Sequence, residues 1–208
     1  MIHISIVEDD SKYAQTLKKM IESEPDIVVQ EMFSNAAEAK EKLPETGSHV
    51  ILMDIQLPDG KGTDLVHHLK DKIPHVHFIM NTSFDDDENI FYALQGGASG
   101  YIIKTDSTDK IVESIRDVLN GGAPMSSGVA KKVIQYFNQS KQQKKELEDL
   151  TPKENQILEM LAKGLYYKEI SRDLAISLDT VKKHCGNMYR KLHVNNKTEA
   201  INIYLGRK

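Results

Sequence analysis

Short apolar runs alternate with longer amphipathic stretches over the first 120 residues. The runs lie near His3–Val7, Ile27–Phe33, Val50–Met53, His77–Asn81 and Gly100–Ile103. Continuous apolar runs of this length are typical of buried parallel strands. Helical spacing of apolar residues predicts helices near Ser11–Ser23, Asn35–Leu43, Thr63–Asp71, Asp87–Gly96 and Ser107–Asn120. Five such β/α units predict an α/β domain with a doubly wound, five-stranded parallel sheet and helices on both faces.

The pattern stops at the sequence Gly121-Gly122-Ala123-Pro124, which is typical of a chain break between elements. A short helix is expected near Val129–Phe137. The following segment, Asn138–Glu146, is polar throughout and has almost nothing to bury, so we expect a linker that is flexible or loosely helical.

From Leu150 onward only helical patterns occur. Thr151, Pro152 and Glu154 form the signature of a capping box at the start of a helix that Gly164 ends. Further helices are expected at Lys168–Leu174, Leu178–Leu192 and Thr198–Leu205. The tight turn between the second and third predicts a helix-turn-helix within an all-α, four-helix domain. The expected domains are therefore 1–122, a linker at 123–146, and 147–208.

Charge divides the 208 residues in the same way. Residues 1–124 carry 22 acidic against 11 basic side chains, whereas 125–146 and 147–208 have net charges of +4 and +3. This asymmetry suggests two units with different partners. The single Cys185 excludes an internal disulfide. Met1 leads almost directly into the first apolar run, and no apolar stretch approaches the ~18 residues of a membrane helix. We therefore expect a cytoplasmic protein without a membrane partner.

Polar side chains follow four of the predicted strands where each strand ends. Glu8 and Asp9 follow the first, Asp54 the third, Thr82 the fourth and Lys104 the fifth. The carboxyl ends of parallel strands share one edge of the sheet, where ligands of such folds bind. Each residue alone is more often a turn cap, a solvated strand end or a packed hydroxyl. Together, in this order, they predict a site for a cation and a phosphoryl group.

The residue types suit that chemistry. Glu8, Asp9 and Asp54 repel one another unless a hard dication neutralises them, and Mg²⁺ accepts carboxylates together with water and phosphate oxygens. The metal also screens Asp54, so that its oxygen can attack a phosphoryl group. Lys104 can pair with the transferred phosphate, and the Thr82 hydroxyl can hydrogen-bond to it.

Four segments resemble the receiver domain of two-component response regulators. They are IVEDD (Ile6–Asp10), MDIQLPDGKG (Met53–Gly62), MNTS (Met80–Ser83) and GASGYIIK (Gly97–Lys104). The resemblance implies that a sensor histidine kinase phosphorylates Asp54. It also implies that Mg²⁺ is held by Glu8 through water, Asp9, Asp54 and the backbone carbonyl of Gln56, that Thr82 and Tyr101 form the switch pair, and that Lys104 pairs with phosphate. The chain departs from many receivers at Thr105, where they have proline, so a cis peptide is not expected there.

The third helix of the carboxyl-terminal domain is basic. Lys182, Lys183 and Arg190 recur on it, with Asn187 on a neighbouring face. A helix of this length fits the major groove of DNA, where these side chains can contact base edges. Thr180 and Lys191 could instead hold phosphates, which position a protein without specifying sequence. Without the preceding turn, a basic solvated helix would be the favoured interpretation.

The same region resembles the LuxR-type helix-turn-helix, the output domain of NarL/FixJ-class response regulators. The matching segments are LTPKENQILEMLAKGL (Leu150–Leu165), KEISRDLAIS (Lys168–Ser177) and DTVKKHCGNMYRKLHVNNKTEA (Asp179–Ala200). Within the last of these segments, Gly186 leaves one position of the third helix without a side chain. The two resemblances together imply a transcriptional response regulator that binds double-stranded DNA after phosphorylation, as a homodimer.

Two alternatives belong to other functional classes. The first is an aspartyl-phosphate phosphatase, but such enzymes typically need an acid/base Asp two residues after the nucleophile, where this chain has Gln56. We therefore predict a protein that is not an enzyme. The second is a signalling adaptor whose helical domain binds protein, against which the basic third helix argues.

Overall fold

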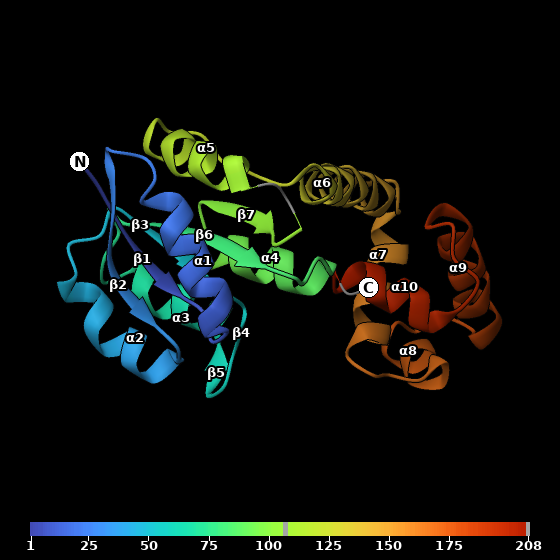
Figure 1. Ribbon diagram of the computed structural model, residues 1–208. Helices are drawn as coiled ribbons and strands as arrows, with labels where there is room; N and C mark the ends of the chain where they lie inside the picture. Colours follow the sequence, from blue (N-terminus) through green and yellow to red (C-terminus); the bar gives the residue numbers. More distant parts are fainter. Residues whose placement is uncertain (106–107, 207–208) are drawn as a thin grey trace. The chain divides into compact units, whose positions relative to one another are not determined.

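The computed structural model describes residues 1–105 and 108–206, which form two compact units, 1–133 and 134–208. The first unit contains a five-stranded parallel sheet (Figure 1) in the order β2-β1-β3-β6-β7. Its strands are β1 (Ile2–Val7), β2 (Ile27–Phe33), β3 (Val50–Met53), β6 (His77–Thr82) and β7 (Gly100–Ile103). The predicted parallel sheet is confirmed.

Helices cover both faces of this sheet. They are α1 (Ser11–Ile21), α2 (Ala36–Lys42) with the 3₁₀ turn η1 (Leu43–Glu45), α3 (Gly62–Lys70), α4 (Asp87–Gln95) and α5 (Thr108–Leu119). Side chains alternate between the faces along each strand. Val50 and Leu52 thus pack with α1 and α5, while Ile51 and Met53 pack with α2, α3 and α4. The expected start of the fifth helix, Ser107, lies outside the described residues.

Strand register brings the predicted polar residues to one edge. Val7 pairs with Met53, Met53 with Met80, and Met80 with Tyr101. The residues that follow these strands therefore leave the sheet at the same level. A short antiparallel hairpin, β4 (Gln56–Leu57) and β5 (Gly60–Lys61), follows the third strand.

Helix α6 (Ser127–Glu148) is the main departure from expectation. We expected a helix near 129–137 followed by a polar linker, flexible or loosely helical, whereas the structure has one continuous helix of 22 residues. The polar segment has no Gly or Pro and is rich in Gln, Lys and Glu, which are good helix formers. The start of α6 belongs to the first unit, since Val129 is buried in its core. The predicted domain boundaries stay a prediction.

The second unit is helical, with α7 (Pro152–Ala162), α8 (Tyr167–Asp173), α9 (Leu178–Lys191) and α10 (Lys197–Tyr204). The capping box expected at Thr151 and Glu154 is present. Ala175, with φ of 51°, makes the turn between α8 and α9, and Ser177 caps α9. Apolar side chains of all four helices share one core. The predicted helix-turn-helix architecture is confirmed. In the two described stretches of chain, every helix is too short or too polar to cross a membrane.

Candidate functional site

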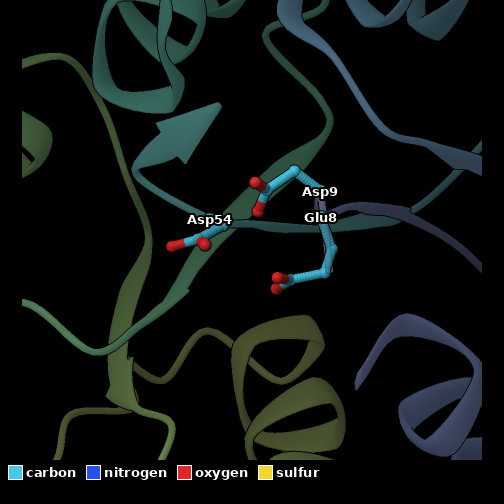
Figure 2. Close-up of side chains that lie close together, drawn as sticks. All are labelled: Glu8, Asp9 and Asp54. Atoms are coloured by element: carbon cyan, nitrogen blue, oxygen red, sulfur yellow. The ribbon is translucent and has the colours of Figure 1, made fainter. Parts of the chain in front are cut away.

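Three carboxylates meet at the carboxyl-terminal edge of the sheet. Glu8 and Asp9 follow β1 and Asp54 follows β3, and one oxygen of each lies within 4.8 Å of the others. Figure 2 shows Glu8 and Asp9 extending towards the side on which Asp54 lies. Glu8 is 3% exposed and Asp54 is 6% exposed, whereas Asp9 is exposed to solvent. Like charges this close, two of them buried, need a cationic partner.

Lys104 supplies part of that positive charge. Its ammonium lies 2.8 Å from Asp54 Oδ2 and 2.6 Å from Glu8 Oε2. Burial alone would lower the pKa of Lys104, but its hydrogen bonds to Asp54 and Glu8 outweigh that effect and raise it. Burial raises the pKa of Glu8, and Lys104 opposes that rise. One ammonium therefore balances part of a three-carboxylate cluster, and this oxygen-rich donor set fits Mg²⁺.

Backbone contacts hold Asp54 in place. Its N–H donates to the carbonyl of Val7 at 2.9 Å, and its Oδ1 accepts from the N–H of Ile55 at 2.7 Å. Gln56, whose carbonyl is a predicted metal ligand, lies two residues further on at the start of β4, with its side chain exposed. The side-chain part of the predicted ligand set is thus assembled around Asp54.

Thr82 and Tyr101 both contact the loop after β6. Thr82 is buried, and its Oγ1 accepts from the N–H of Phe84 at 3.4 Å. Tyr101 is fully buried, its hydroxyl donates to the carbonyl of Phe84 at 2.8 Å, and burial raises the pKa of the phenol. The predicted switch pair is therefore connected through one residue, Phe84.

The sequence pattern did not point to two further residues near this site. Tyr13, in the first turn of α1, places its ring 4.7 Å from the Lys104 ammonium. The ammonium of Lys132, on α6, contacts both the backbone carbonyl and the carboxylate of Asp85, the residue after Phe84. Asp10, which caps α1 three residues before Tyr13, was a signal for the start of the helix but not for the side to which the Tyr13 ring turns. Lys132 gave no signal, because its contact with Asp85 depends on the rotation of a helix that the strand pattern does not place.

Most of the predicted DNA-binding residues lie on the solvent side of α9. Lys182, Lys183 and Arg190 are exposed. Asn187 accepts a hydrogen bond from Arg190 at 2.6 Å, so these two side chains are held together. The Thr180 hydroxyl lies 2.8 Å from that of Ser177, the cap of α9, and marks the amino-terminal end of the helix.

Lys191 is placed differently. Its ammonium lies 2.7 Å from Glu154, which is 3% exposed, and donates to the carbonyl of Asp149 at 3.1 Å. Burial raises the pKa of Glu154, but the hydrogen bonds from Lys191 and Thr151 outweigh it and hold that pKa below its usual range. Lys191 thus ties the end of α9 to the start of α7, and any phosphate contact would share its ammonium with this pair.

Comparison with known proteins gives matches over both units. The model of the response regulator receiver domain matches residues 4–116, and that of the luxR family of bacterial regulatory proteins matches residues 148–204. Over 208 residues the chain is 33% identical to the transcriptional regulatory protein LnrK of Bacillus subtilis (strain 168), covering 96% of this chain and 94% of that protein. It is 31% identical to LiaR of the same organism over 200 residues, covering 96% and 95%.

A solved structure matches as well. A structure of the RcsB response regulator of Salmonella typhimurium, solved to address its conformational dynamism for DNA interaction, has a TM-score of 0.65. The match covers 99% of this chain and 98% of that one at 21% identity. At this identity the likeness concerns the fold.

Proposed function

The chain belongs to the two-component response regulators that join a receiver domain to a LuxR-type DNA-binding domain, and from this premise we propose that phosphorylation of Asp54 by a sensor histidine kinase controls its binding to DNA. It is a DNA-binding transcriptional regulator. The observation that carries the proposal is the buried Asp54, whose carboxylate lies within 4.8 Å of those of Glu8 and Asp9 and 2.8 Å from the Lys104 ammonium. We also propose that the protein is cytoplasmic, because it would act on DNA and receive its phosphoryl group from a kinase.

The acceptor site would work as follows. Mg²⁺, held by Glu8 through water, Asp9, Asp54 and the Gln56 carbonyl, would screen the negative charge between acceptor and donor. An oxygen of Asp54 attacks the phosphorus of the donor, the donor's bond to phosphorus breaks, and an acyl phosphate forms on Asp54. The Lys104 ammonium, already 2.8 Å from Asp54, would pair with the new phosphate. Gln56, in place of a second Asp, supports a switch rather than turnover of external substrates.

The phosphate would be sensed through the loop after β6. In the proposed active state the Thr82 hydroxyl bonds to phosphate instead of accepting from the N–H of Phe84, and Tyr101 moves with the loop. Support comes from the hydrogen bond of Tyr101 to Phe84 and the contact of the adjacent Asp85 with Lys132 of α6. A change in this loop would therefore reach α6, the helix that leads towards the DNA-binding domain. Such a change is a population shift between two states.

DNA would be contacted by α9. Lys182, Lys183, Asn187 and Arg190 would face the major groove, with Thr180 and Lys191 near phosphates. We propose that the phosphorylated protein is a homodimer, because a dimer doubles the phosphate contacts and fixes the spacing of two half-sites.

The test of this function is sedimentation and DNA binding of the full chain, with and without a small phosphodonor and Mg²⁺. We expect the phosphodonor to produce a dimer and to tighten DNA binding. If the dimer is the form that binds DNA more tightly, phosphorylation that stabilises the dimer must also increase the affinity for DNA. An unchanged monomer with tighter DNA binding would instead indicate that the acidic receiver shields the basic helix until it is phosphorylated. No change in either property would contradict the proposed control by phosphorylation.

Lys182→Ala and Lys183→Ala variants should bind DNA more weakly. If a lysine contacts phosphate, affinity should fall for all sequences and the slope of log K against log salt should decrease by about one. If it contacts a base edge, the loss should be ~1–3 kcal/mol at the cognate site only. Gel-shift titrations over a salt series measure both effects.

Lys163→Ala is the matched control, since Lys163 is also exposed but lies at the end of α7, where it pairs with Glu159. It should bind as the parent does. Parental binding by both α9 variants would remove these residues from the proposed DNA interface.

A further inference from the structure

The aromatic ring of Tyr13 contacts the ammonium of Lys104 at the carboxylate site. The Lys104 ammonium lies over its ring at 4.7 Å from the centroid, within the range of a cation–π interaction. The negative face of an aromatic ring attracts an ammonium as a carboxylate does, but without a charge that would bind metal or repel phosphate. Lys104 therefore contacts two carboxylates and one ring.

The position of this ring is set by its neighbours at both ends. The carboxylate of Asp10 accepts from the N–H of Tyr13 at 3.1 Å and from that of Lys12 at 2.9 Å, which fixes the first turn of α1. At the far end, the Asn81 amide donates to the Tyr13 hydroxyl at 3.0 Å, and the hydroxyl lies 3.3 Å from the amide oxygen. Asn81 directly precedes Thr82 on β6. Tyr13 thus connects α1, β6 and the lysine that follows β7.

The contact matters because lysine is a long and flexible side chain. The Lys104 side chain is 17% exposed, so it remains partly accessible to solvent. An ammonium that moves out towards water must be brought back before it can pair with a phosphoryl group, and that ordering costs free energy in the transition state. A ring fixed by hydrogen bonds opposes the outward movement.

We propose that Tyr13 is a positioning residue for phosphoryl transfer to Asp54, which acts by keeping the Lys104 ammonium at the acceptor site. This inference rests on the proposed function. The two parts of the Tyr13 side chain have different roles in this proposal. The ring holds the ammonium, and the hydroxyl only orients the ring through Asn81.

Two substitutions in the full-length protein separate those parts. Tyr13→Leu removes the ring, and we expect the initial rate of phosphorylation by a small phosphodonor with Mg²⁺ to fall about tenfold. Tyr13→Phe keeps the ring and loses only the hydroxyl, so its rate should stay within about twofold of the parent. Phosphoprotein gels that retain acyl phosphates follow both rates.

Repeating the Tyr13→Leu substitution in a Lys104→Gln background distinguishes positioning of the ammonium from a general loosening of the fold. In Lys104→Gln the ring has no cation to hold, so adding Tyr13→Leu should change the residual rate by less than about twofold. An equal loss in both backgrounds would assign Tyr13 a purely structural role and overturn the proposal, as would a Tyr13→Leu rate equal to the parent's. Failure of the parent itself to gain phosphate would contradict the proposed function, whereas a labelled parent with an unaffected Tyr13→Leu variant contradicts only this inference.

Discussion

An Asp54→Asn variant should gain no phosphoryl group under conditions in which the parent gains one. The amide has almost the same shape, so the hydrogen bond from the Ile55 N–H to the side-chain oxygen can be kept. It has no negative charge and is not a nucleophile towards phosphorus, so the acyl phosphate cannot form. The expected effect is complete loss of labelling with a folded protein. The measurement is intact-mass spectrometry after incubation with a small phosphodonor and Mg²⁺.

Asp59→Asn is a matched control for this experiment. Asp59 lies in the adjoining β4–β5 hairpin, and its carboxylate accepts from the N–H groups of Ala36 and Ala37 at 2.6 and 2.8 Å. The variant weakens a helix cap but leaves the acceptor site intact, so one phosphoryl group should still be added. Excess chelator should stop labelling of both Asp59→Asn and the parent. Labelling of Asp54→Asn at the parental rate would show that another residue is the acceptor.

The location of the carboxylate cluster was predictable from the apolar pattern alone. Segments of four to seven mostly apolar residues identify buried strands, and in a parallel sheet all their carboxyl ends lie at one edge. Residues separated by 46 positions, such as Glu8 and Asp54, are therefore brought together by topology without any knowledge of side-chain contacts. The chemistry followed from the residue types that occupy those strand ends.

Contacts that depend on helix rotation were not predictable in this way. Tyr13 contacts Lys104 and Lys132 contacts Asp85 from helices, where a shift of one residue in the helix start turns a side chain by about 100°. Lys191 is similar, because its partner Glu154 lies on another helix 37 residues away. The continuity of the helix through the linker was not predicted for a different reason. Its polarity indicated only that it has nothing to bury, whereas its helix propensity determines its local structure.

Gly62 packs directly against the backbone of Asp54. It is the first residue of α3, and its N–H donates to the carbonyl of Ile55 at 2.8 Å. A Cβ at this position would lie 1.9 Å from the backbone oxygen of Asp54 and 2.9 Å from Met53 Cγ. Because the nearest atom is backbone, a side-chain rotation cannot relieve the clash. The start of α3 and the end of β3 would have to move apart, and Asp54 would move with them.

Gly62→Ala should therefore destabilise the receiver unit by about 3 kcal/mol, near the upper end for overpacking, and slow phosphorylation of Asp54. Gly186→Ala is the control, because Gly186 lies within α9 and a Cβ there has no neighbour within 4 Å. That variant should stabilise α9 by about 1 kcal/mol and leave phosphorylation unchanged. Hydrogen exchange of the β3 and α9 amides measures the two local stabilities in the same protein. The prediction fails if Gly62→Ala matches the parent both in hydrogen exchange of the β3 amides and in phosphorylation. The contact between position 62 and Asp54 would then relax without cost, and the position of Asp54 would not depend on it.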